Sequence, residues 1–145
     1  MNHSFRCQCP ITSAVDIIGD KWTIVIVKQM LIEGKTTFKD FTDSTEAIAT
    51  NILSTRLKNL ESFGLITKEK LPHNKKTNIY LLTERGLALA PVILELTLWS
   101  DEHLREFHPD LQKDERLEWV KENKEEAFQL TVKNYKAKVE MIAAG

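Results

Sequence analysis

Two cysteines near the amino terminus are the residues best suited to covalent chemistry. Cys7 and Cys9 are the only cysteines, and Cys9 directly precedes Pro10, a residue that favours the first position of a helix. A thiol at a helix N-terminus lies at the positive end of the helix dipole, which lowers its pKa and raises its share of reactive thiolate. Two interpretations stay open: Cys9 is a redox-sensing thiol, or it is a small residue that begins a helix.

Cys7 is the second candidate thiol, as a partner that resolves an oxidised Cys9. A disulfide between two residues this close in sequence is strained, so we expect an intersubunit or mixed disulfide instead. His3 and the two cysteines are three candidate ligands on one chain end, which do not define a tetrahedral site. We therefore expect no metal and no cofactor.

A second group of residues is suited to contact nucleic acid. At about 100° per residue, a helix over Thr50–Ser62 places three leucines on one face. The opposite face carries short polar side chains and one cation, which can approach base edges and phosphates closely. Thr50 begins this helix, and the polar face consists of Asn51, Ser54, Thr55, Lys58 and Ser62.

Arg56 lies beside the apolar face of this helix and has two candidate roles. In the first, its stem packs on the core while its guanidinium bridges to a carboxylate or to backbone carbonyls. In the second, it contacts a phosphate of the nucleic acid. We favour the first role and keep the second open.

Positive charge is concentrated in the same part of the chain. The net charge is -1 overall, but residues 50–80 hold six Lys or Arg against two Asp or Glu. A basic stretch in a neutral protein favours an anionic partner, although a merely solvated surface is the alternative. Within it, segments 66–71 and 77–82 predict a β-hairpin. Its polar tip follows Pro72 and is expected to reach DNA phosphates through His73, Asn74, Lys75 and Lys76.

Helices must position most of these residues. Apolar spacing predicts helices over 10–18, 21–33, 38–42 and 45–63, and the second should be buried. Thr83 can cap a helix that runs to about residue 104 with a bend at Pro91. After His108-Pro109, two helical stretches are expected, at 112–123 and 124–143. The predicted fold is mainly α with a β-hairpin (α+β): a winged helix-turn-helix with an added helical C-terminal extension.

Two domains are expected. Residues 1–104 form a winged-helix DNA-binding domain with an N-terminal helix and a dimerisation helix, and residues 105–145 form the extension. The helix 84–104 has apolar residues on two sides, so one side needs a second copy of the chain. The expected dimer interface consists of Leu94, Leu98 and Trp99.

A small-molecule effector is the alternative to thiol sensing. The ligand would enter an apolar pocket near the dimer interface, lined by Trp22, Phe38, Leu94 and Trp99. A third reading is a winged helix that binds protein, against which the polar helix face and the basic stretch argue. The chain lacks a phosphate-binding glycine loop, GxSxG and HExxH, so we expect no enzyme. It also lacks an apolar run approaching 18 residues and a signal-peptide pattern, so we expect no membrane partner and a cytoplasmic location.

Several segments, in order, resemble the HxlR family of bacterial winged-helix regulators. Residues 9–22 read CPITSAVDIIGDKW, residues 38–41 read FKDF, and the strongest match is IATNILSTRLKNLE at 48–61. The resemblance continues through GLI at 64–66, Tyr80, LTERG at 82–86 and Trp99, and covers about residues 7–102.

The resemblance implies a homodimeric, MarR-related regulator that places two winged helices on a pseudo-palindromic site in double-stranded DNA. It also implies an oxidant or electrophile sensor, because several relatives use the cysteine that matches Cys9. Two departures stand out. Many relatives have Ser-Pro where this chain has Ala49-Thr50, so capping of the recognition helix is expected to be weaker or shifted. The extension after Leu104 is also longer than the family core.

Overall fold

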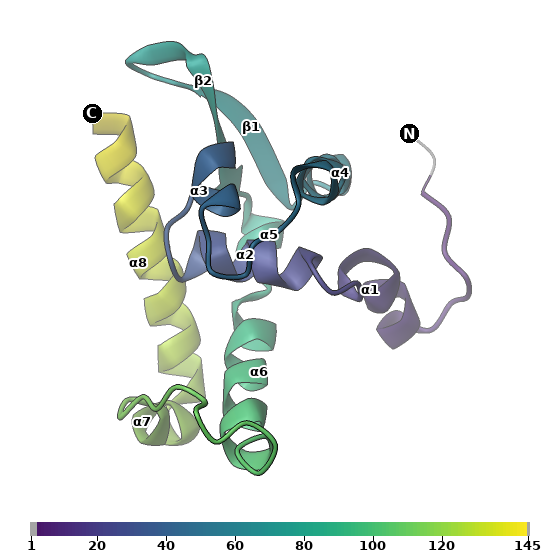
Figure 1. Cartoon of the computed structure of the whole chain (residues 1–145), viewed down its shortest axis with the longest axis vertical. Coiled ribbons are helices and arrows are strands. Elements are labelled where there is room, and N and C mark those ends of the chain that lie inside the picture. The colour runs from purple at the N-terminus through teal and green to yellow at the C-terminus, as the bar shows by residue number, and fades with distance from the viewer. Residues whose placement is uncertain (1–2, 145) are drawn as a thin grey trace.

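The computed structural model describes residues 3–144 and consists of helices around one antiparallel hairpin (Figure 1). Residues 1–2 and 145, which the expected domains include, lie outside the described residues. This arrangement confirms the predicted α+β winged helix-turn-helix. The elements in chain order are α1 (Pro10–Ile18), α2 (Thr23–Leu31), α3 (Phe38–Thr42), α4 (Thr50–Ser62), β1 (Ile66–Leu71), β2 (Asn74–Leu82), α5 (Glu84–Leu87), α6 (Ala90–His103), α7 (Leu117–Glu122) and α8 (Lys124–Ala144).

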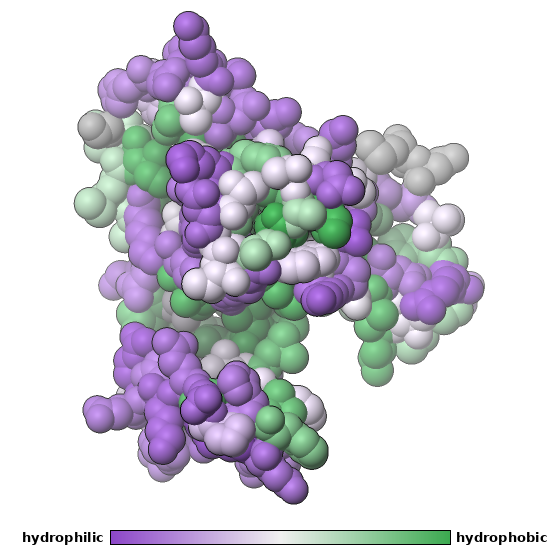
Figure 2. All heavy atoms as spheres, viewed as in Figure 1, coloured by the Kyte–Doolittle hydropathy of each residue, from purple (hydrophilic) through white to green (hydrophobic). Residues whose placement is uncertain are grey.

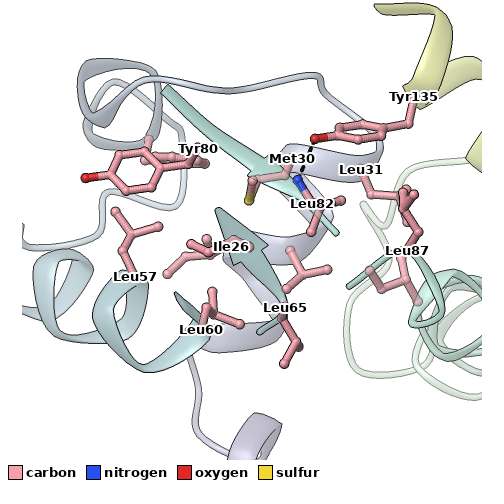
Figure 3. Packing of buried hydrophobic residues seen from close by; sticks show 14 of the residues in the cluster. Ile26, Met30, Leu31, Leu57, Leu60, Leu65, Tyr80, Leu82, Leu87 and Tyr135 are labelled. Carbon is pink, nitrogen blue, oxygen red and sulfur yellow. Dashed lines mark hydrogen bonds between the residues drawn. The ribbon is translucent and has the colours of Figure 1, made fainter. Parts of the chain in front are cut away.

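Helix α2 lies at the centre, as its apolar residues predicted. Ile26, Val27 and Met30 are fully buried, and the side chains of α4, the hairpin and α8 pack around them (Figure 3). Burial of this apolar surface is the main driving force for folding. The candidate DNA-contacting helix is therefore anchored on a well-packed core.

Helix α4 begins at Thr50, the start used for its polar face, and not at residue 45, where apolar spacing placed it. Ala47 adopts a left-handed backbone conformation with φ of 56°, which no helix can include. Ala49 then occupies the N-cap position, and its methyl group cannot accept a hydrogen bond from the first turn. This confirms the expected weak capping of the helix.

Further predicted boundaries are wrong. Helix α2 spans Thr23–Leu31 and not 21–33. Strand β2 begins at Asn74, so the turn contains only Pro72 and His73, and a register shift at Lys70/Leu71 accommodates it. The predicted bent helix over 84–104 is two helices, α5 and α6. Pro91 lacks the N–H that would bond to the carbonyl of Leu87, and it instead occupies the first turn of α6.

The C-terminal extension packs against the winged-helix part at two places. Tyr135 of α8 lies in the main core, and its hydroxyl accepts a hydrogen bond from the Leu82 backbone N–H at 2.7 Å (Figure 3). Leu98 of α6 forms a second cluster with Leu117, Val120 and Ala127. Helix α7 begins at Leu117 and is thus shorter than the predicted stretch 112–123. Within residues 3–144, no helix has the length and apolar character needed to cross a membrane.

Candidate nucleic-acid interface

Helix α4 presents the polar face that its sequence predicts. Leu53, Leu57 and Leu60 are exposed by only 0%, 3% and 1%, so they fix the rotation of the helix about its axis. The residues on the other side are accessible: Thr50, Asn51, Thr55 and Lys58 are exposed and Ser54 is half-buried. The Thr55 hydroxyl donates to the Asn51 carbonyl at 2.9 Å and keeps its acceptor lone pairs available. The structure thus brings these predicted α4 residues together on one surface, whereas Ser62 is half-buried and its hydroxyl lies 2.6 Å from Nε2 of His3.

Helix α3 and the loop after it hold the start of α4. A capping box stabilises α3: the Asp40 N–H donates to the Thr37 hydroxyl, and the Thr37 N–H donates to the Asp40 carboxylate, both at 3.1 Å. In the loop, Glu46 pairs with Lys28 of α2 and accepts from Gln29 at 2.9 Å. The bond from Lys28 is the main cause that holds the pKa of Glu46 below its ordinary value. These contacts join the helix-turn-helix pair to the central helix.

Arg56 connects α4 to the corner between α1 and α2. Its Nε donates to the Asp20 carboxylate at 2.9 Å, and that carboxylate also accepts from the backbone N–H groups of Trp22 and Thr23. Partial burial raises the pKa of Asp20, but the hydrogen bonds from Thr23, Arg56 and the backbone outweigh it and lower the pKa to about 2. Asp20 is therefore ionised at neutral pH. The structure contains the carboxylate bridge of the first role considered for Arg56, and the phosphate contact stays a prediction.

The C-terminal end of α4 is fixed to the segment that follows the hairpin. Gly64 has φ of 76°, a conformation that glycine adopts readily, and it ends the helix. The Thr83 hydroxyl donates to the Gly64 carbonyl at 2.6 Å, and the Arg85 guanidinium donates to the Phe63 carbonyl at 2.8 Å. Thr83 and Arg85, which belong to neither α4 nor the hairpin, thus set the angle between these two elements through their hydrogen bonds.

The hairpin formed by β1 and β2, called the wing below, is basic along its length. Lys75 and Lys76 are exposed on β2, and Lys68 and Lys70 are exposed on β1, where the alternation of a strand puts them on one face. His73 lies in the turn, while the Asn74 amide donates to the Thr77 hydroxyl at 2.9 Å and so shapes the tip from inside. Figure 2 shows a hydrophilic surface over the wing at the top of the view. The wing therefore presents several cations to an anionic partner.

The thiol candidates are both accessible. Cys9 is the N-cap of α1, and Cys7 precedes it in the exposed N-terminal segment. The backbone N–H and the hydroxyl of Thr12, followed by the backbone of Ile11, stabilise the thiolate and lower the pKa of Cys9. This is the effect that the helix N-terminus predicted. No cluster of metal-ligand residues occurs among residues 3–144.

The expected dimer residues lie in different environments. Leu98 is exposed by 7% and, with Leu94, packs against α7 and α8 of the same chain, whereas Trp99 is exposed by 55%. The pocket that the sequence suggested beside this interface is also not assembled in the described part of the chain. Trp22 and Phe38 instead pack on the main core.

Sequence reasoning missed two contributions to this surface. Asp20 pairs with an arginine that lies 36 residues further along the chain, so the pair has no local signal. The position of Asp20 before the predicted start of α2 would, however, have suggested a helix cap. The second contribution is that of Lys68 and Lys70: they belong to the basic stretch, and the period of a strand is the signal that puts them on one face.

Comparisons with known proteins extend these observations. The model of the HxlR-like helix-turn-helix family matches residues 17–108. The HTH-type transcriptional regulator YodB of Bacillus subtilis is 35% identical over 96 residues, which are 66% of this chain and 85% of YodB. Solved forms of YodB include a reduced, a diamide-treated and a quinone-bound form.

Two other solved structures are similar in fold. The structure of PA1607 has a TM-score of 0.66 at 32% identity, and the alignment covers 75% of this chain and 73% of PA1607. The redox regulator HypR in its reduced form has a TM-score of 0.60 at 28% identity, with 70% of this chain and 99% of HypR covered. HypR has also been solved in an oxidised form.

Proposed function

Since this chain belongs to the HxlR-like family of DNA-binding helix-turn-helix transcriptional regulators, which are not enzymes, we propose that it acts as a homodimer on a pseudo-palindromic operator. Each copy inserts α4 into the major groove of double-stranded DNA, and each wing rests on the flanking backbone. The two-fold symmetry of the dimer would be matched by that of the operator.

The exposed polar face of α4 is the observation that carries this proposal. Asn51 can form paired hydrogen bonds with adenine, and the hydroxyls of Thr50, Ser54 and Thr55 can contact bases or phosphates. Lys58 is the one cation on this face and suits a phosphate. Acidic side chains would repel DNA, and the helix has none before Glu61. Arg56 acts in this scheme as a positioning residue through Asp20.

The exposed apolar side chains of α1 and α6 support the homodimer. Val92, Leu96 and Trp99 of α6 are exposed by 39%, 47% and 55%, and their spacing of four and three residues makes one stripe. On α1, which projects to the side of the molecule (Figure 1), Ile11 and Val15 are exposed by 76% and 47%. Apolar patches of this kind mark protein interfaces. We therefore assign the interface to Trp99 with Leu96 and α1. Leu94 and Leu98 support it indirectly, because they pack α6 against α7 and α8 of the same chain.

Sedimentation analysis of Leu96→Glu/Trp99→Glu tests this interface. Two buried carboxylates in an apolar interface should give a monomer. Leu130→Glu, at an exposed leucine of α8, is the matched control and should leave the dimer intact. A dimeric double variant would contradict the assignment.

Oxidation or electrophile modification of Cys9 is the proposed switch. The exposed Cys9 thiol has a lowered pKa, which favours attack by the thiolate on an oxidant or electrophile. In the oxidative case, two thiols release two electrons and two protons to an oxidant such as diamide and join through one S–S bond. Cys7 and Cys9 of opposite subunits are the candidate pair. The reduced and oxidised forms of HypR and the quinone-bound form of YodB are the supporting parallels.

Fluorescence anisotropy with duplex DNA from upstream of the chain's own gene tests the function and the switch together. The titration is run in reductant and after diamide treatment, for wild type, Cys9→Ser and Cys7→Ser. We expect binding in reductant and an oxidation-dependent change in affinity that Cys9→Ser removes. Tight DNA binding that diamide does not change would support the DNA-binding function and reject the thiol switch. A small-molecule effector would then be the second candidate for the signal.

A further inference from the structure

A pocket of about 740 Å³ lies between α8 and the corner where α5 meets α6. Its volume falls in the range of small-molecule sites, roughly 300–1,000 Å³. It is separate from the DNA-contacting face of α4 and from Cys9, and one wall is formed by α8, which lies beyond the family match at 17–108. Its apolar walls include Leu87, Ala88 and Pro91 on one side and Phe128, Val132 and Ala137 on the other.

Small side chains account for the hollow. Ala88 faces it from the α5–α6 corner and Ala137 from α8, so neither wall contributes a large side chain at these positions. Tyr135 of α8 is instead directed into the main core, where its hydroxyl meets Leu82 (Figure 3). A bulky residue at 137 would occupy the space.

The charges at the rim are unevenly distributed. Lys136 pairs with Glu84 at 3.0 Å, whereas the exposed Lys133 has no ion pair within the described range 3–144. Glu140 is seven residues along α8 from Lys133, a separation of about 10 Å in a helix. One end of the apolar pocket therefore offers an uncompensated cation, with the amide of Gln129 one turn away.

From this combination we propose that the pocket binds a small amphipathic organic anion. Its ring or hydrocarbon part packs between Pro91, Phe128 and Val132, and its carboxylate pairs with Lys133. The site differs from the one that the sequence suggested around Trp22, Phe38, Leu94 and Trp99. It adds a ligand class that the proposed DNA binding does not require.

Isothermal titration calorimetry with two matched probes tests this site directly. The anion 2-naphthoate and the neutral 2-naphthamide share one ring system and differ in charge. We expect one naphthoate per wild-type chain. Lys133→Met keeps the stem and removes the charge, so naphthoate should bind about threefold more weakly, as for an exposed ion pair, while naphthamide is unaffected. Lys113→Met, at another exposed lysine, should bind both probes like wild type.

Ala137→Phe fills the pocket and should weaken both probes at least about tenfold. Wild type that binds neither probe, or two pocket variants that bind like wild type, would overturn the proposal. A change of oligomeric state in Ala137→Phe, measured by sedimentation, would also overturn it, because the groove would then be an interface between copies. Should Ala137→Phe fail to fold, Lys133→Met with the two probes still decides. None of these measurements involves DNA, so they stand apart from the proposed function.

Discussion

The winged-helix part and the C-terminal extension are held by different kinds of contact. In the first, hydrogen bonds and ion pairs join segments far apart in sequence, as Asp20 does for Arg56 and Thr83 for the Gly64 carbonyl. The extension is attached by apolar packing around Tyr135 and around Leu98 and by one buried hydrogen bond, from Leu82 to Tyr135. Its other polar contacts lie at the surface, where ion pairs contribute little, and include Lys136–Glu84, Lys124–Glu95 and Lys121–Asp101. Directional contacts fix angles, whereas apolar packing is non-directional. We infer that contacts within residues 17–108, which match the family model, specify the orientation of α4 and the wing. Helix α8 stabilises this arrangement by packing against the main core.

The largest loss in free energy of unfolding should come from Gly86→Ala, which disturbs the close packing of the winged-helix part. An added Cβ would lie 2.3 Å from the Leu65 carbonyl oxygen, so the backbone where α5 passes Leu65, just before β1, must shift. Overpacking of this kind costs roughly 3 kcal/mol in free energy of unfolding. Urea denaturation followed by circular dichroism measures it. A loss under about 0.5 kcal/mol, as for an ordinary surface substitution, would show that this close approach is not tightly specified.

Tyr135→Phe tests the main polar contact of the extension and should have the next largest effect. It leaves the buried Leu82 N–H without its acceptor, a cost of about 1–3 kcal/mol. Amide hydrogen exchange at Leu82 should also become faster, because the base of the wing opens more often.

Tyr80→Phe is the matched control, since Tyr80 is also buried and its hydroxyl has no hydrogen-bond partner within residues 3–144. Equal exchange at Leu82 in wild type and Tyr135→Phe would mean that α8 gives the wing no support.

Asp20→Asn should have the smallest effect, and it tests a single polar contact of the winged-helix part. The folded-state pKa of about 2 lies below the ordinary 3.8, so ionised Asp20 stabilises the fold above pH 3.8, and this contribution is lost as the pH falls towards 2. The side chain is 31% exposed, so we discount the shift for solvent screening and expect about 1 kcal/mol at pH 7. Urea denaturation at several acidic pH values should show a shallower acid loss in Asp20→Asn. Parallel pH profiles would contradict the role of this carboxylate.

Local periodicity predicted much of this molecule, including both ends of α1 and α3 and the polar face of α4. It succeeded where each residue's environment depends on its own helix or strand. It failed at Ala47, whose left-handed backbone delays α4, and at Pro91, where the chain breaks into α5 and α6. The pairing of Asp20 with Arg56 and the covering of Leu98 by α7 depend on contacts between distant segments, which no local pattern contains.

The salt dependence of DNA binding tests the central claim most directly, namely that α4 and the wing together contact duplex DNA. Anisotropy titrations at several salt concentrations would compare wild type with Lys58→Ala, Lys75→Ala/Lys76→Ala and the control Lys113→Ala. Each lysine that neutralises a phosphate should reduce the slope of log K against log salt by about 0.9 per subunit. We predict shallower slopes for the α4 and wing variants and a wild-type slope for Lys113→Ala. Identical slopes in all four proteins would contradict the account.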